Sequence, residues 1–174
     1  MKLYVKAAVF TLVVLGGFGG LVPALLVRGR DAADGALFVL AVCLMAIGAA
    51  MYLRCVWDFA VFGKGTPAPI DEPKRLVVRG LYRYTRNPMY VGLLTLISGW
   101  AILFASVVLA WCGVFLFVFF SMFVRLYEEP HLSRKFGAEY EVYKARVGRW
   151  LPRFSRSRGG AVNPPGLSGG RADR

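Results

Sequence analysis

The stretch MYVGLLTLISGWAILFASVVLAWCGVFLFVFFSMFV, residues 89–124, decides how this chain folds, because it contains no Asp, Glu, Lys or Arg. As one helix, at roughly 1.5 Å per residue, it would be far longer than the apolar core of a bilayer, which is about 30 Å thick. The stretch therefore has to reverse direction, and Phe104-Ala105-Ser106 is the best candidate for the turn. We expect two membrane-spanning helices in a tight hairpin, at residues 89–104 and 107–126.

Two further apolar segments precede the hairpin, at residues 3–27 and 35–62. Apolar residues make up 57% of the 174 residues, whereas soluble domains have roughly 45–50%. The sequence therefore predicts an all-α integral membrane protein with about four transmembrane helices. Val22-Pro23-Ala24 loosely resembles a signal-peptidase site, but the first apolar segment is longer than the usual signal core.

Lysine and arginine are concentrated in the link at residues 63–88 and in the region after residue 124, and the formal net charge is +12. The link between the first two segments has only Arg28 and Arg30, which two aspartates offset, and the hairpin turn has neither basic residue. Positive charge marks the cytoplasmic side of a membrane protein. Both termini and the 63–88 link are therefore predicted to be cytoplasmic. This topology explains most of the charge without a nucleic-acid partner.

The parts outside the spans differ in character. The 63–88 link is rich in glycine and proline and is predicted to be an ordered, non-helical cover. Residues 130–147 carry apolar side chains at helical spacing, which predicts an amphipathic helix that lies on the bilayer or folds over the span ends. Residues 155–174 are expected to form a disordered basic tail, leaving one domain at residues 1–154. The apolar stripe of the helix consists of Leu132, Phe136, Tyr140, Tyr143 and Val147.

Polar residues at the membrane boundary are the candidate functional groups, because such groups are costly there. Asn87 either caps the third span or contacts a ligand. Glu128 and Glu129 either pair with Arg125 and nearby basic residues or receive the ammonium or hydroxyls of a polar ligand. Arg54 lies one helical turn from an aspartate, Asp58, and mutual neutralisation is the simplest interpretation of that pair.

Metal binding and disulfide formation have little support in the sequence. The only histidine is His131, so a zinc site built from Cys and His has too few candidate ligands. The cysteines lie in apolar stretches without metal-ligand spacing, which indicates free thiols. They are Cys43, Cys55 and Cys112.

Two separated motifs resemble a known family. The first is Gly80-Leu81-Tyr82 with Arg86-Asn87-Pro88-Met89-Tyr90; the second is Glu128-Glu129-Pro130-His131-Leu132 with Phe136-Gly137 and the two following tyrosines. In this order and spacing they resemble the isoprenylcysteine carboxyl methyltransferase and phospholipid methyltransferase superfamily of integral membrane enzymes. The resemblance covers roughly residues 76–152.

The resemblance implies S-adenosylmethionine as methyl donor and a lipophilic acceptor, either a prenylcysteine-type carboxylate or a lipid amine. It implies Glu129 as a catalytic and cofactor-binding residue and Arg125 as a catalytic and substrate-binding residue. Asn87 stands where carboxyl-methylating members have His, and an amide cannot act as a base near neutral pH. The implied cofactor-binding residues are Lys74, Arg75, Leu76, Val77, Tyr82, Asn87, Pro88, Met89, Tyr90 and Glu129.

Two other functions stay open at this point. An NADPH-dependent membrane reductase of the lipid or sterol type shares the Pro-x-Tyr and Tyr-x-x-Tyr likeness. A non-catalytic membrane scaffold would explain the basic tail and the tryptophan anchors, but not the ordered placement of Tyr, Asn, Arg and Glu. The sequence leaves the methyl acceptor and the oligomeric state undetermined.

Overall fold

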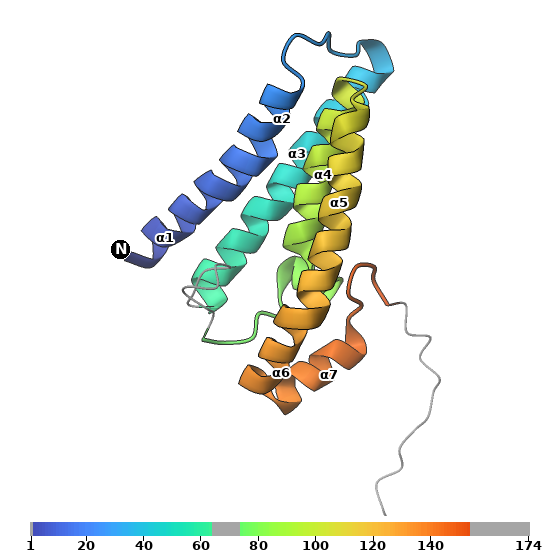
Figure 1. The fold of residues 1–174 in the computed structure, drawn as a ribbon. Coiled ribbons are helices and arrows are strands. Elements are labelled where there is room, and N and C mark those ends of the chain that lie inside the picture. The colour runs from blue at the N-terminus through green and yellow to red at the C-terminus, as the bar shows by residue number, and fades with distance from the viewer. Residues whose placement is uncertain (1, 64–73, 154–174) are drawn as a thin grey trace, which may run out of the picture.

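The structure is a computed structural model, and it describes residues 2–63 and 74–153 (Figure 1). Every regular element in these ranges is a helix; the β-contacts are limited to an isolated bridge between Thr85 and Gly148. The predicted all-α class is confirmed. Residues 64–73 of the predicted link and the predicted tail at 155–174 lie outside the described residues.

The apolar helical segments run up and down in turn (Figure 1). The first is continuous from α1 (Lys2–Thr11) through the π-helical η1 (Leu12–Leu21) to α2 (Val22–Leu26). The second is α3 (Gly35–Asp58) with the π-helical η2 (Phe59–Gly63). The third and fourth begin as α4 (Pro88–Leu103) and α5 (Val107–Phe123).

In the part of the chain that the structure describes, three helices are long and apolar enough to cross a membrane: Tyr4–Leu26, Gly35–Gly63 and Val107–Phe136, with mean hydropathy of 2.2, 2.5 and 2.6. The helix Pro88–Leu103 is also apolar but has 16 residues, fewer than a typical span. The structure thus supports an integral membrane protein. The count of four spans remains a prediction.

The hairpin turn lies where the sequence predicts it. α4 ends at Leu103 and α5 begins at Val107. Ser106 is the N-cap of α5, and its hydroxyl oxygen accepts a hydrogen bond from the Leu109 amide at 3.4 Å. This contact satisfies one of the free N–H groups that every helix start carries.

Small residues bring the backbones of α3 and α4 into direct contact. A Cβ built on Gly92 would lie 2.9 Å from the Gly48 carbonyl oxygen, and one built on Gly99 would lie 2.8 Å from the Ala41 carbonyl oxygen. In a membrane, where apolar side chains gain little from leaving lipid, close packing of small residues is a main source of helix association. The α3–α4 pair is therefore the central support of the fold. The N-terminal segment joins it where Trp100 Nε1 donates to the Gly19 carbonyl at 2.9 Å.

Two expectations for the C-terminal region were wrong. The helix that starts as α5 does not end at residue 126; it continues through the π-helical η4 (Val124–Glu128) into α6 (Glu129–Phe136). A wide π-type turn gives room for Pro130, whose nitrogen cannot donate to the preceding turn. The predicted single helix at 130–147 is instead α6 and α7 (Ala138–Arg146), separated by Gly137 at φ 53°, a backbone conformation that favours glycine.

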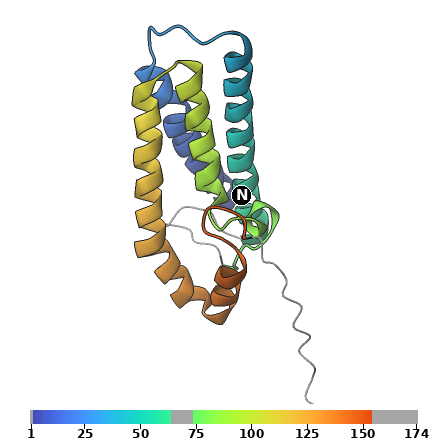
Figure 2. The same ribbon diagram turned by 90° about the vertical axis from the view of Figure 1, so that its right-hand side faces the viewer.

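The predicted apolar stripe is nevertheless a packed unit. Tyr140, Tyr143 and Val147 form a buried cluster with Leu132 and Phe136, to which the link contributes Leu76. α6 and α7 lie at the end of the helices where α4 begins, which is also where the N-terminus lies (Figures 1 and 2). This region therefore lies at the ends of the apolar helices.

Candidate functional site

A cavity of about 330 Å³ lies between the link, the start of α4 and the α5–η4–α6 helix. Its volume is in the range of small-molecule sites, roughly 300–1,000 Å³. One wall is apolar and aromatic, with Phe119, Phe120, Phe123 and Tyr127. The polar part of the lining includes Arg86, Asn87, Glu128, Glu129 and Tyr140. The cavity can therefore hold a ligand that combines a charged end with an aromatic or aliphatic part.

Tyr90 links the two walls. Its ring stacks on Phe120 with centroids 4.4 Å apart, and its hydroxyl donates to Glu128 Oε2 at 3.2 Å. Glu128 is the last residue of the π-helical turn η4. Single π-type turns often occur at functional sites, because they alter the direction of side chains that follow. Here the turn places Glu128 on the cavity surface.

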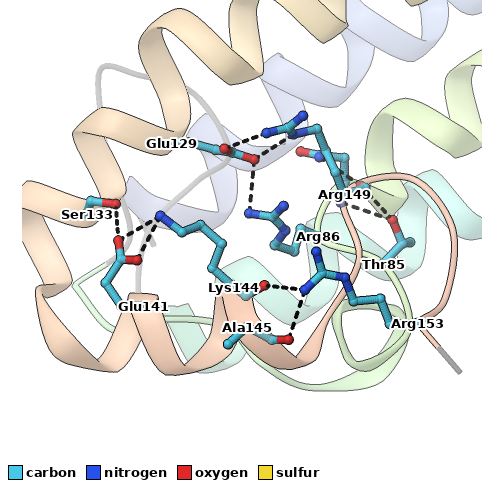
Figure 3. A network of polar contacts seen from close by, with 10 residues as sticks. Thr85, Arg86, Glu129, Ser133, Glu141, Lys144, Ala145, Arg149 and Arg153 are labelled. Carbon is cyan, nitrogen blue, oxygen red and sulfur yellow. Dashed lines mark hydrogen bonds and ion pairs between the residues drawn. The ribbon is translucent and has the colours of Figure 1, made fainter. Parts of the chain in front are cut away.

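Glu129 is held by two arginines (Figure 3). Arg149 donates twice, from Nε to Oε1 at 2.7 Å and from Nη2 to Oε2 at 2.8 Å. Arg86 Nη1 lies 2.9 Å from Oε1. The predicted pairing of the acidic motif with basic side chains is confirmed for Glu129, but its partners are not Arg125. Arg125 is exposed, and Arg86 and Arg149 reach Glu129 from the link and from the segment after α7.

The segment after α7 is tied to the first motif by its backbone. The Arg149 carbonyl accepts hydrogen bonds from Thr85 Oγ1 at 2.9 Å and from Asn87 Nδ2 at 3.0 Å, and the Gly148 carbonyl accepts one from the Arg86 amide at 2.9 Å. Asn87 is the N-cap residue of α4 by position, but its side chain makes no capping hydrogen bond. The interpretation of its side chain as a cap alone was therefore wrong.

Two buried tyrosines brace the same region. Tyr143 donates from its hydroxyl to the Tyr82 carbonyl at 2.8 Å. Burial raises the pKa of both phenols, so both stay neutral at physiological pH. Neutral phenols can orient a ligand through hydrogen bonds, but they cannot supply a negative charge.

The structure separates the residues implied by the family resemblance into two groups. Those that line the cavity are Leu76, Val77, Tyr82, Asn87, Met89, Tyr90 and Glu129. The other four do not line it: Lys74, Arg75 and Arg125 are exposed, and Pro88 is buried in the first turn of α4. Their predicted contacts with donor or acceptor remain predictions.

Glu128, predicted to pair with basic residues or to receive a polar ligand, lines the cavity, whereas Arg86 and Arg149 were not among the predicted site residues. Arg86 stood inside the first motif, so its position was a usable signal. Arg149 had no such signal, because the sequence shows it as one of many basic residues beyond the last span.

The predicted pairing of Arg54 with Asp58, at the end of α3, is confirmed: Arg54 Nη2 lies 3.4 Å from Asp58 Oδ1. Among the described residues, no group of three His, Cys, Asp or Glu side chains is placed to hold a metal ion.

Comparison with known proteins assigns the family. A model of the phospholipid methyltransferase family matches residues 36–139. The chain belongs to the phospholipid methyltransferase family. The matched range of this family member runs from the start of α3 to the start of α7 and includes most of the cavity.

A relative of this methyltransferase-family chain is an uncharacterized protein of Haemophilus influenzae. It is 41% identical over 64 residues, which are 36% of this chain and 100% of the relative. No solved structure gives a significant match. The family membership therefore rests on sequence, and the cavity described above adds the geometry.

Proposed function

We propose that this protein transfers a methyl group from S-adenosylmethionine to a lipophilic acceptor at the cytoplasmic face of the membrane. The observation that carries the proposal is the convergence of both family motifs on one cavity. Tyr82, Asn87 and Tyr90 come from the first motif, Glu129 comes from the second, and all four line it. The apolar helix hairpin separates these motifs in sequence, so their meeting is a property of the fold.

The cavity suits such a donor in chemical terms. Bound S-adenosylmethionine would supply an electrophilic methyl group on a positively charged sulfur. The rings of Tyr90, Phe120 and Phe123 offer faces that favour cations and aromatic bases. Glu128 offers a carboxylate that accepts the Tyr90 hydroxyl. Both oxygens of Glu129 already take part in ion pairs, so in this proposal Glu128 meets the cationic end of the donor; the predicted donor contact of Glu129 stays open to test.

The protein's contribution to methyl transfer would be to hold donor and acceptor in line. Positioning of this kind can supply much of the rate of a displacement reaction. The aromatic wall also excludes water from the reacting atoms. The proposal includes two acceptor classes, a lipid amine and a prenylcysteine-type carboxylate. A labelled-methyl assay distinguishes them.

Calorimetry on the purified full chain in detergent micelles tests the donor. We expect saturable binding of S-adenosylmethionine and none of NADPH. Glu128→Gln should weaken donor binding, whereas Glu139→Gln, at an exposed position of α7, should not. Binding of NADPH alone would support the reductase, and binding of neither cofactor would favour the scaffold; each result would overturn the proposal.

A labelled-methyl assay on membranes tests the reaction. Membranes that contain the protein should transfer label from the donor into the lipid or prenyl-peptide fraction, and chemical identification of the labelled product defines the acceptor. Donor binding without any transfer to these fractions would refute the proposed activity.

A further inference from the structure

Arg86 is a buried guanidinium that its neighbours neutralise only in part. Its side chain is 7% exposed, and it lines the cavity. Its ion pair is with Glu129 Oε1, at 2.9 Å, but the same carboxylate already holds Arg149 through two hydrogen bonds. Two arginines thus share one carboxylate (Figure 3).

The hydrogen-bond geometry leaves Arg86 incompletely satisfied. Its buried Nη1 lies 2.9 Å from Glu129 Oε1 but is not aligned for a hydrogen bond, and within the described part of the chain its buried Nε has no hydrogen-bond acceptor. Buried donors of a charged group are expensive to leave without a partner, and native structures have few of them. Arg149 shows the contrast, because both of its hydrogen bonds to Glu129 are short and its side chain is 27% exposed.

The cavity also holds a carboxylate. Glu128 lines it and accepts the Tyr90 hydroxyl at 3.2 Å. A carboxylate and a guanidinium with an unpaired N–H therefore line one cavity. This pattern matches a zwitterionic ligand, whose cationic end suits the carboxylate and whose anionic end suits a guanidinium.

We infer that Arg86 is the anion-binding residue of this cavity, and that its unused N–H groups take a carboxylate or phosphate of the ligand. The inference rests on the proposed function and deepens it. The forked guanidinium matches planar oxyanions with two parallel hydrogen bonds. The oxyanion has two possible sources: the carboxylate at the amino-acid end of the methyl donor, or the phosphate of a lipid acceptor.

The test compares ligands that differ by one oxyanion. The donor pair is S-adenosylhomocysteine, which has the carboxylate, and 5′-methylthioadenosine, which lacks it. The acceptor pair is a short-chain phosphoethanolamine lipid and an alkylamine of similar length. Binding of all four is measured by calorimetry on the full chain in detergent, with the native protein and with Arg86→Gln, Arg86→Lys and Arg83→Gln. Arg83 is the matched control, because it is exposed and lies three positions earlier, in the 3-10 helix η3 (Gly80–Arg83).

We expect Arg86→Gln to weaken binding of the oxyanion-bearing ligand of one pair by about ten-fold or more. Binding of the other ligand of that pair should weaken by no more than about two-fold. The affinity of Arg86→Lys for that ligand should lie between those of Arg86→Gln and the native protein. Arg83→Gln should bind all four ligands as the native protein does. If only S-adenosylhomocysteine binds more weakly, Arg86 binds the carboxylate of the donor. If only the phosphate-bearing lipid binds more weakly, Arg86 binds the phosphate of the acceptor. If Arg86→Gln does not fold, as judged by its melting profile, Arg86→Lys is compared in the same way.

Equal effects on both members of each pair, or no effect on any ligand, would overturn the inference. Failure of the proposed function looks different: the native protein would then bind neither nucleoside. In that case the lipid pair still decides whether Arg86 binds an oxyanion.

Discussion

Arg149 and Glu129 form a two-bond ion pair, with Nε 2.7 Å from Oε1 and Nη2 2.8 Å from Oε2. The pair joins the first residue of α6 to the segment that follows α7. Because the Arg149 carbonyl also receives Thr85 and Asn87, one residue connects both family motifs. The C-terminal segment is thus part of the site rather than an appendage to it.

Arg149→Gln should destabilise the protein by about 1–3 kcal/mol, because it leaves Glu129 with Arg86 alone. Arg149→Lys keeps the positive charge but loses the two-pronged guanidinium. Its stability should therefore lie between those of Arg149→Gln and the native protein. Arg153→Gln is the control, since Arg153 is exposed and bonds to the backbone carbonyls of α7. Thermal unfolding in detergent measures all three, and an equal loss for Arg149→Gln and Arg153→Gln would contradict the central place of the ion pair.

Asn87→Asp replaces a donor with a carboxylate that faces the Arg149 carbonyl. We expect a loss of about 1–3 kcal/mol, since the hydrogen bond at 3.0 Å is lost and two oxygens confront each other in a buried place. Thr85→Val removes the second bond to the same carbonyl without adding charge and should cost less, about 0.5–1.5 kcal/mol. Chemical or thermal unfolding ranks the two variants. If Asn87→Asp left the free energy of unfolding unchanged, the Asn87 amide would not hold the C-terminal segment.

Gly80→Ala should be more damaging than Gly137→Ala, although both glycines have a positive φ, at 55° and 53°. A Cβ at Gly137 meets nothing within 4 Å, so the expected cost is the conformational one, about 1–3 kcal/mol. A Cβ at Gly80 would collide with the carboxylate of Asp58, which is 1% exposed and cannot withdraw into water. The added overlap should cost about 1–3 kcal/mol more. Similar melting temperatures for the two variants would show that this contact relaxes freely.

The topology can be tested with cysteine labels in intact cells. After the native cysteines are replaced, a cysteine at exposed Ala32 should react with a membrane-impermeant maleimide from outside, whereas one at exposed Glu139 should react only after the membrane is opened. The reason is the concentration of Lys and Arg at the end where α6 and α7 lie. The reverse labelling pattern would refute the predicted cytoplasmic location of the site.

The sequence allowed the hairpin and the convergence of the motifs to be predicted, because both follow from a charge-free stretch too long for one span. It also predicted the Leu132–Val147 stripe, since apolar spacing survives a break in the helix. The break itself, at Gly137, and the continuous helix through Pro130 depend on local backbone angles that the spacing pattern does not encode.

The partners of Glu129 were beyond prediction for a different reason. Sequence spacing suggests pairs within a helix, such as Arg125 with Glu129, but the partners of Glu129 come from other segments of the chain. Arg149 reaches Glu129 only because the chain turns back after α7, and that path depends on tertiary contacts with Thr85 and Arg86.

The short helix α4 has a consequence for how a lipid would reach this protein. Its 16 residues measure about 24 Å, some 6 Å less than a hydrocarbon core of about 30 Å. A span of that length thins the surrounding bilayer or draws its polar ends inward. The cavity lies at the N-terminal end of α4, so it would sit at or below the plane of the neighbouring phosphates. A membrane lipid could then present its headgroup by sideways diffusion, with its acyl chains still in the bilayer and no energy spent on extraction.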